Sequence, residues 1–202
     1  NWDGRCHMMH RMPMSGIYEL FIPGVGDGAV YKYEMKLKGG TIQLKSDPYA
    51  VCTELPPASA SVVKDLRNYV WDDAAWMEAW MADRKKYADR DQPVSIYETS
   101  LTAWENPQEL VDYVKKLKYT HVELHPVMEY LNEDSGEYST FAYYAPDRRF
   151  GMPEDFQQLV NALHKENIGV ILDWTPSHFP REEGGLELFD GTPLYENPDP
   201  SM

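Results

Sequence analysis

Two spacings of apolar residues divide the chain. Within residues 1–50, short runs of alternating apolar and polar residues, such as Val30–Met35 and Thr41–Lys45, are separated by glycine-containing turns. From residue 94 onward, short apolar runs alternate with segments in which apolar residues recur every three or four positions. The first pattern is typical of antiparallel β structure, and the second indicates strands connected by amphipathic helices.

The N-terminal pattern predicts three strands, at Tyr18–Ile22, Val30–Met35 and Thr41–Lys45. Short strands joined by tight turns suggest a β-sandwich, but three strands are too few to close one. We therefore expect residues 1–50 to be the C-terminal part of a sandwich whose first strands are missing.

Residues 51–93 follow neither pattern. Pro56–Pro57 and a run of small residues lead into a tryptophan-containing segment. Trp76 and Trp80 are four positions apart, which places them on one face of a helix. We expect an irregular connector between two domains, with one short helix.

Residues 94–202 predict parallel strands joined by crossover helices. Strand patterns lie at 94–101, 120–127 and 168–173, and helices are expected to begin at Pro107 and Pro153. A long loop, 128–152, precedes the second helix. A complete (β/α)₈ barrel needs roughly 250 residues and about 110 are present here, so the segment is either a small doubly wound sheet or a truncated barrel.

Composition narrows the class of protein. The chain has 33 acidic and 19 basic residues, a net charge of -14, which argues against a nucleic-acid surface. No apolar run approaches the roughly 20 residues of a membrane-spanning helix. Cys6 and Cys52 lack metal-ligand spacing, and the N-terminus lacks a signal sequence, so we expect a cytoplasmic protein with reduced thiols.

The opening at Asn1 and the end at Met202, with no closing element, suggest that both ends are cuts.

The main candidate for chemistry is the end of the third strand pattern. The apolar run Val170–Leu172 ends at Asp173, and His178 follows five residues later, beyond Pro176. In parallel α/β sheets and barrels, active sites are built where strands end. Asp173 and His178 are therefore predicted to line a catalytic cleft. The alternative is structural: an aspartate that caps a turn and a histidine bonded to backbone.

A second candidate lies on the middle strand pattern. His121, Glu123 and His125 alternate and so share one face of a strand. With Asp173 and His178 nearby they could build a zinc or di-metal hydrolase centre. A structural network of buried polar groups accounts for the same residues without a metal.

The third candidate is the tyrosine-rich loop. Its length is typical of a functional loop. Tyr138 or Tyr143 could form a sugar platform, and Arg148 or Arg149 an ion pair. Alternatively the loop packs against the sheet and the arginines bind loop carbonyls. The sequence contains no glycine-rich phosphate motif and no nucleophile elbow, so nucleotide binding and serine hydrolysis have no support.

Several stretches resemble successive segments of bacterial 1,4-α-glucan (glycogen) branching enzymes, members of glycoside hydrolase family 13 in the α-amylase clan. They are SIYETSLTAW, THVELHPVMEY, YYAPDRRFG, DFQQLVNALHKENIGVILDWTPSHFP and FDGTPLYENPDP. The upstream residues resemble the glycogen-binding β-sandwich that precedes the catalytic barrel. The resemblance implies an α/β plus β fold: a partial sandwich at 1–50, a connector at 51–93, and the first three strands of a (β/α)₈ TIM barrel at 94–202.

The resemblance also implies an activity. Branching enzymes are retaining transglycosylases that cleave an α-1,4 bond and form an α-1,6 bond in glycogen biosynthesis, using two carboxylates. In the family these carboxylates follow the fourth and fifth barrel strands and so are not in this chain, which we therefore expect to be inactive alone. A stand-alone, non-catalytic α-glucan-binding protein is the alternative.

Three site residues carry over from the family by resemblance. Asp173 matches the aspartate that orders the active-site arginine and the nucleophile, and His178 the histidine that bonds the 6-hydroxyl of the sugar. Tyr138 matches the tyrosine that stacks on the same sugar. Ser177 stands where amylases often have a calcium-holding asparagine, so we expect no metal and no cofactor. The implied partner is an α-glucan such as glycogen.

Overall fold

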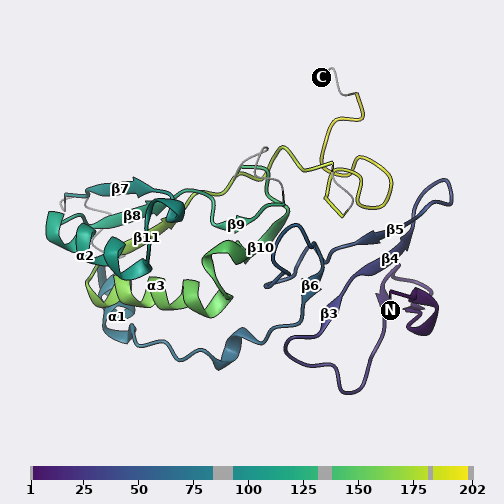
Figure 1. Cartoon of the computed structure of the whole chain (residues 1–202), viewed down its shortest axis with the longest axis horizontal. Helices are drawn as coiled ribbons and strands as arrows, with labels where there is room; N and C mark the ends of the chain where they lie inside the picture. The colour runs from purple at the N-terminus through teal and green to yellow at the C-terminus, as the bar shows by residue number, and fades with distance from the viewer. Residues whose placement is uncertain (1, 84–92, 132–137, 182–183, 200–202) are drawn as a thin grey trace.

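The computed structural model describes residues 2–83, 93–131, 138–181 and 184–199. Strands β1 to β6 and their loops form the N-terminal part of the molecule, and a sheet covered by helices forms the other end (Figure 1). The hairpin of β9 (Met128–Glu129) and β10 (Ala142–Pro146) lies between these two parts (Figure 1). Within the described residues, no helix combines the length and apolar character needed to cross a membrane.

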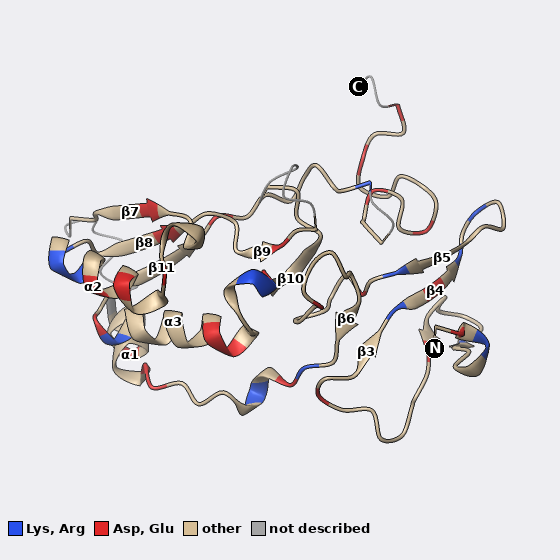
Figure 2. Cartoon of the chain, in the orientation of Figure 1, with Lys and Arg blue, Asp and Glu red and all other residues tan. Residues whose placement is uncertain are grey.

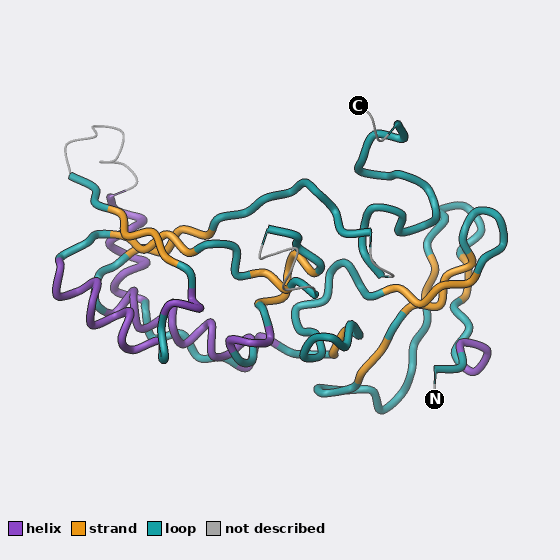
Figure 3. The backbone as a smooth tube through the Cα atoms, turned by 45° about the horizontal axis from the view of Figure 1, so that its top comes forward, coloured by secondary structure: helices purple, strands orange, loops and turns teal. Residues whose placement is uncertain are grey.

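The helix-covered sheet has three parallel strands in the order β11-β8-β7. They are β7 (Ile96–Thr99), β8 (His121–Leu124) and β11 (Gly169–Leu172). Helices α2 (Pro107–Leu117) and α3 (Pro153–Lys165) lie side by side on one face of this sheet (Figures 1 and 3). The predicted β-α-β-loop-α-β order is confirmed.

Local sequence signals explain where both helices begin. Asn106 caps α2, because its side-chain oxygen accepts the Glu109 N–H at 3.1 Å, and Pro107 occupies the first turn. At α3, the backbone N–H of Met152 donates to the Asp155 carboxylate at 2.7 Å. Helix α2 ends at Leu117, and the capping residue Lys118 takes a left-handed conformation with φ 61°.

The core lies between this sheet and its two helices. The apolar stripe of α2, Leu110, Val111 and Val114, packs with Val122 and Leu124 of β8. Helix α3 adds Leu159 and Leu163 from its own buried face. The strand face away from the helices carries Glu98 of β7 beside Glu123 of β8, which are register partners and appear as adjacent acidic segments in Figure 2.

The predicted long loop, 128–152, contains regular structure. Strands β9 (Met128–Glu129) and β10 (Ala142–Pro146) pair antiparallel, and the 3₁₀ turn η5 (Arg148–Phe150) leads into α3. Residues 132–137 of this segment lie outside the described residues. The expectation of an unstructured connection was wrong because β9 is too short to carry a recognisable alternation.

The N-terminal strands pair two by two. Strand β1 (His10–Arg11) pairs with β2 (Tyr18–Glu19), β4 (Tyr33–Lys36) with β5 (Ile42–Lys45), and β3 (Val30–Tyr31) with β6 (Ser61–Val62), all antiparallel. Short 3₁₀ turns occur at Gly4–Cys6 (η1) and Leu66–Asn68 (η2). The β character of this part is confirmed, although the predicted strand Tyr18–Ile22 is shorter than expected.

A short helix was expected within residues 51–93, and the described part of that range contains α1 (Ala74–Asp83). Trp76 and Trp80 share a face, with ring centroids 6.3 Å apart and planes 14° from parallel. Trp76 also stacks on His164 of α3, with ring centroids 3.7 Å apart, so α1 is attached to the helix layer. Residues 84–92 lie outside the described residues.

Candidate functional site

Asp173 and His125 are neighbours at the carboxyl ends of adjacent parallel strands. The backbone N–H of Asp173 donates to the Leu124 carbonyl at 2.9 Å, and that of His125 donates to the Thr99 carbonyl at 3.0 Å. These bonds continue the ladder of β11, β8 and β7 by one residue. The sequence placed Asp173 at a strand end, and the structure puts it there.

Two more side chains lie at the same edge of the sheet. His125 Nε2 is 3.3 Å from Glu98 Oε1, and the ring of His125 lies 6.5 Å from that of Tyr138. Tyr138 is 46% exposed. The edge thus collects Asp173, a histidine–glutamate pair and a tyrosine ring, which are groups able to accept or donate hydrogen bonds and to stack.

His178 lies in the loop that follows β11. Its backbone is left-handed, with φ 57°, and its side chain is exposed, with Nδ1 2.9 Å from Ser177 Oγ. The next residue is held in place, because the N–H of Phe179 donates to the Glu196 carboxylate at 3.1 Å.

An aromatic hollow of about 190 Å³ adjoins this loop. Tyr143 meets Trp174 edge to face at 6.2 Å, and Phe179 lies 5.7 Å from Tyr143. Rings from four separate segments line it: Tyr49, Tyr143, Tyr144, Trp174, Phe179 and Tyr195. Flat apolar rings at an open surface offer stacking platforms for ring-shaped ligands.

The sequence did not single out most of these rings. Tyr49 and Tyr144 stack with centroids 5.6 Å apart although they are 95 positions apart in the chain. Trp174 sits directly after Asp173, and its exposed fraction is 57%. The aromatic content of 13% was the only general signal for such a cluster.

Among the described residues, no three His, Cys, Asp or Glu side chains come together as a metal would require, so the metal-centre hypothesis gains no support from them. His121 Nδ1 lies 2.9 Å from Thr120 Oγ1, and burial lowers the pKa of His121. His125 instead pairs with Glu98. Each of these two histidines therefore has a partner within the protein.

Both expectations for the two loop arginines are confirmed. Arg149 forms an ion pair with Asp147 at 3.0 Å and also donates to the Tyr130 carbonyl at 3.0 Å. Arg148 donates to the backbone carbonyls of Thr53 and Gly151. Arg148 therefore links the segment before α3 to Thr53 of the connector, whereas Arg149 joins residues within that segment.

The family models match two regions. Residues 1–50 match carbohydrate-binding module 48, the isoamylase N-terminal domain, and residues 107–187 match the alpha amylase catalytic domain. The crystal structure of a putative alpha amylase from Salmonella typhimurium superposes with a TM-score of 0.68 at 22% identity, over 90% of this chain and 30% of that one. At 22% sequence identity, this comparison shows a similar fold and carries no information about function.

Curated relatives match nearly the whole chain. The 1,4-alpha-glucan branching enzyme GlgB of Nitrosococcus oceani is 44% identical over 100% of this chain and 28% of the relative. The enzymes of the same name from Frankia casuarinae and Myxococcus xanthus are 48% and 46% identical, each over 98% of this chain and over 25% and 29% of their own lengths. The chain thus spans between a quarter and three tenths of these relatives.

Proposed function

We propose that this chain is part of a 1,4-α-glucan branching enzyme, because residues 1–50 match carbohydrate-binding module 48 and residues 107–187 match the alpha amylase catalytic domain. The enzyme would cleave an α-1,4 bond in a glucan and transfer the released segment to a 6-hydroxyl. Identities of 44–48% to three enzymes of that name, along nearly the whole chain, support this proposal.

The observation that carries the proposal is the arrangement at the sheet edge. Asp173 ends its strand beside His125, and the Tyr138 ring lies within 6.5 Å of His125. We assign Asp173 to ordering the reacting groups, His178 to binding the sugar 6-hydroxyl, and Tyr138 to stacking on that sugar. The aromatic hollow around Trp174 would extend the surface on which the glucan lies.

The domain organisation is part of the proposal. Residues 1–50 would be the end of the glycan-binding module, 51–93 the connector, and 94–202 the beginning of the barrel. A cytoplasmic location is supported by two cysteines that do not pair, since Cys6 is exposed and Cys52 is buried.

The test is a branching assay on the complete protein encoded by the gene that contains this chain. Incubation with amylose should shift the iodine absorbance, and enzymatic debranching should release new short chains. Asp173→Asn and His178→Ala should each abolish both signals while the protein still elutes as the unsubstituted form does. The exposed substitution Asp112→Asn, on α2, is the matched control. Unchanged activity in Asp173→Asn would refute the assigned site.

A non-catalytic α-glucan-binding protein is the second candidate. It is favoured by one observation: all six rings of the aromatic hollow belong to this chain. Binding of maltoheptaose by a complete protein that never branches amylose would select this candidate, whereas branching activity would exclude it.

A further inference from the structure

His178, which the proposed function assigns to the sugar 6-hydroxyl, has a backbone conformation that residues other than glycine rarely adopt. Its φ of 57° lies in the left-handed region. Two other non-glycine residues of the described chain share this conformation, Lys118 and Asn167, and each lies just after a helix, where a left-handed residue is common. His178 lies in a loop instead. Contacts with other segments must therefore hold it, since a strained residue persists only where its surroundings fix it.

The residue after His178 is held by a segment further along the chain. The N–H of Phe179 donates to Glu196 Oε1 at 3.1 Å, across 17 positions of sequence. The ring of Tyr195 lies 5.2 Å from the ring of Phe179, so the same segment contacts both the backbone and the side chain of Phe179. The N–H of Phe179 belongs to the planar peptide unit that directly follows His178. The bond to Glu196 therefore limits the rotation of the His178 backbone.

The start of the same loop is attached to β10. The hydroxyl of Tyr143 donates to the Thr175 carbonyl at 3.3 Å. Ser177 and His178 lie between this bond and the one at Phe179, so the loop is fixed on both sides of the histidine. Ser177 Oγ lies 2.9 Å from His178 Nδ1, so Nε2 is the ring nitrogen that would meet a sugar hydroxyl.

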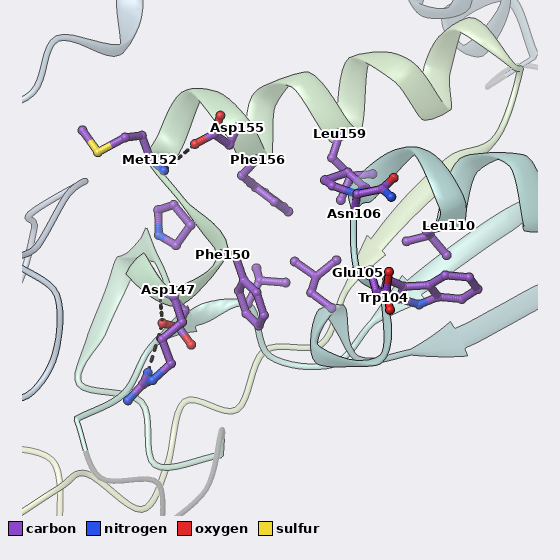
Figure 4. Close-up of a pocket in the computed structure, with 15 residues that line it drawn as sticks. Trp104, Glu105, Asn106, Leu110, Asp147, Phe150, Met152, Asp155, Phe156 and Leu159 are labelled. Atoms are coloured by element: carbon purple, nitrogen blue, oxygen red, sulfur yellow. Dashed lines mark hydrogen bonds and ion pairs between the residues drawn. The ribbon is translucent and has the colours of Figure 1, made fainter.

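The bond from Phe179 to Glu196 differs from the local bonds that carboxylates make to nearby backbone. Asp155, for example, accepts the N–H of Met152 three positions away, at the start of α3 (Figure 4). Such a bond is part of the helix start. Glu196 and Phe179 both lie in loops, outside any helix or strand. No regular backbone pattern would take over the Phe179 N–H if the Glu196 carboxylate were removed.

We propose that Glu196 is a positioning residue for His178. Its half-buried carboxylate holds the N–H of Phe179 and thereby keeps His178 in the left-handed conformation from which its imidazole binds the sugar. That the imidazole meets a sugar hydroxyl rests on the proposed function. The dependence of the His178 conformation on Glu196 rests on the loop contacts alone.

The first measurement is hydrogen exchange, followed by mass spectrometry, on the complete protein encoded by the gene that contains this chain. Overlapping peptides isolate the amide of Phe179. Glu196→Ala should accelerate its exchange by about tenfold or more, as loss of a hydrogen bond to a charged group does. Glu196→Gln should restore part of the protection, because its amide oxygen can still accept. The matched control is Glu166→Ala: Glu166 pairs with Lys115 at 2.7 Å and lies between α3 and β11, at the other end of that strand.

The second measurement is the affinity of the complete protein for maltoheptaose, determined by calorimetry. Glu196→Ala should lower this affinity by about threefold or more when His178 is present. It should cause no further loss in the His178→Ala background, because a residue that acts through His178 then has nothing to position. Glu196→Gln should recover part of the affinity, and Glu166→Ala should not change it. Binding sites elsewhere contribute equally to all these variants and do not affect the comparison.

Unchanged exchange of the Phe179 amide in Glu196→Ala would overturn the proposal, and so would an equal loss of affinity with and without His178. If Glu196→Ala does not fold, Glu196→Met takes its place, because it keeps the length of the side chain and lacks an oxygen acceptor. An affinity that His178→Ala leaves unchanged would instead contradict the sugar contact assigned under the proposed function. The exchange of Phe179 then decides by itself whether Glu196 positions His178.

Discussion

Thr53 and Glu129 are joined by a 2.8 Å hydrogen bond inside the protein, although 76 positions separate them in the chain. Thr53 is 1% exposed and Glu129 is fully buried. The Glu129 carboxylate also accepts the backbone N–H of Arg148 at 2.9 Å, and the Arg148 guanidinium donates to the Thr53 carbonyl at 3.0 Å. This closed cluster attaches the connector to the segment that leads into α3.

Glu129 should make stability depend on pH. Burial raises the pKa of Glu129 to about 7, from about 4.5 in the unfolded chain. Between these values the folded state binds the proton more tightly, so the contribution to stability is full below about pH 4.5 and is lost as the pH rises through about 7. Urea titrations at about pH 5 and about pH 8 should show the lower free energy of unfolding at the higher pH.

Glu129→Gln should reduce the difference in the free energy of unfolding between the two pH values, because the amide of the glutamine does not titrate. Glu78→Gln, an exposed substitution on α1, is the matched control and should leave the difference unchanged. An identical pH dependence in Glu129→Gln and the unsubstituted chain would contradict the assignment.

Thr53→Val should destabilise the fold. The substitution keeps the shape of the side chain but leaves the buried Glu129 carboxylate short of a donor, a loss of about 1–3 kcal/mol. Chemical unfolding measures it directly. Thr41→Val, at an exposed position in the turn between β4 and β5, should change the free energy of unfolding by less than about 0.5 kcal/mol. Equal effects of the two substitutions would show that the cluster does not stabilise the fold.

Asp73→Ala should weaken the attachment of α1 to α3 and so destabilise α1 locally. Asp73 Oδ2 lies 2.8 Å from His164 Nδ1, and both side chains are about nine-tenths buried. The same histidine ring stacks on Trp76 of α1. Without the carboxylate the histidine loses its orientation, so amide hydrogens of α1 should exchange faster while those of α2 keep their rates. Exchange that accelerates equally in both helices would indicate global destabilisation and not a local attachment.

Chelation should leave the chain unchanged. His125 pairs with Glu98 and His121 contacts Thr120, and the described residues hold no cluster of metal-binding side chains. Treatment with EDTA is therefore expected not to alter the melting temperature, and metal analysis should find no stoichiometric zinc. The matched variant His125→Leu should give the same two results. One zinc per chain that disappears in His125→Leu would restore the metal-centre hypothesis.

Much of the α/β part was predictable because its signals are local. Asn106 and Pro107 identify the start of α2, and the spacing of Leu110, Val111 and Val114 identifies its buried face. The strand end at Asp173 followed from a buried apolar run that stops at a carboxylate. Each of these inferences needs only residues within a few positions of one another. Because such neighbours are fixed by helix or strand geometry, the pattern alone suffices.

The sequence pattern alone was enough to predict the alternation of β7, β8 and β11 with α2 and α3, and the position of Asp173 at a strand end. The pairing of distant residues, such as Thr53 with Glu129 and Tyr49 with Tyr144, could be learned only from the folded structure. These contacts depend on how the connector, the β9–β10 hairpin and α3 pack together. No spacing along the chain encodes that packing, because side chains from separate elements become neighbours only once the core has brought those elements together.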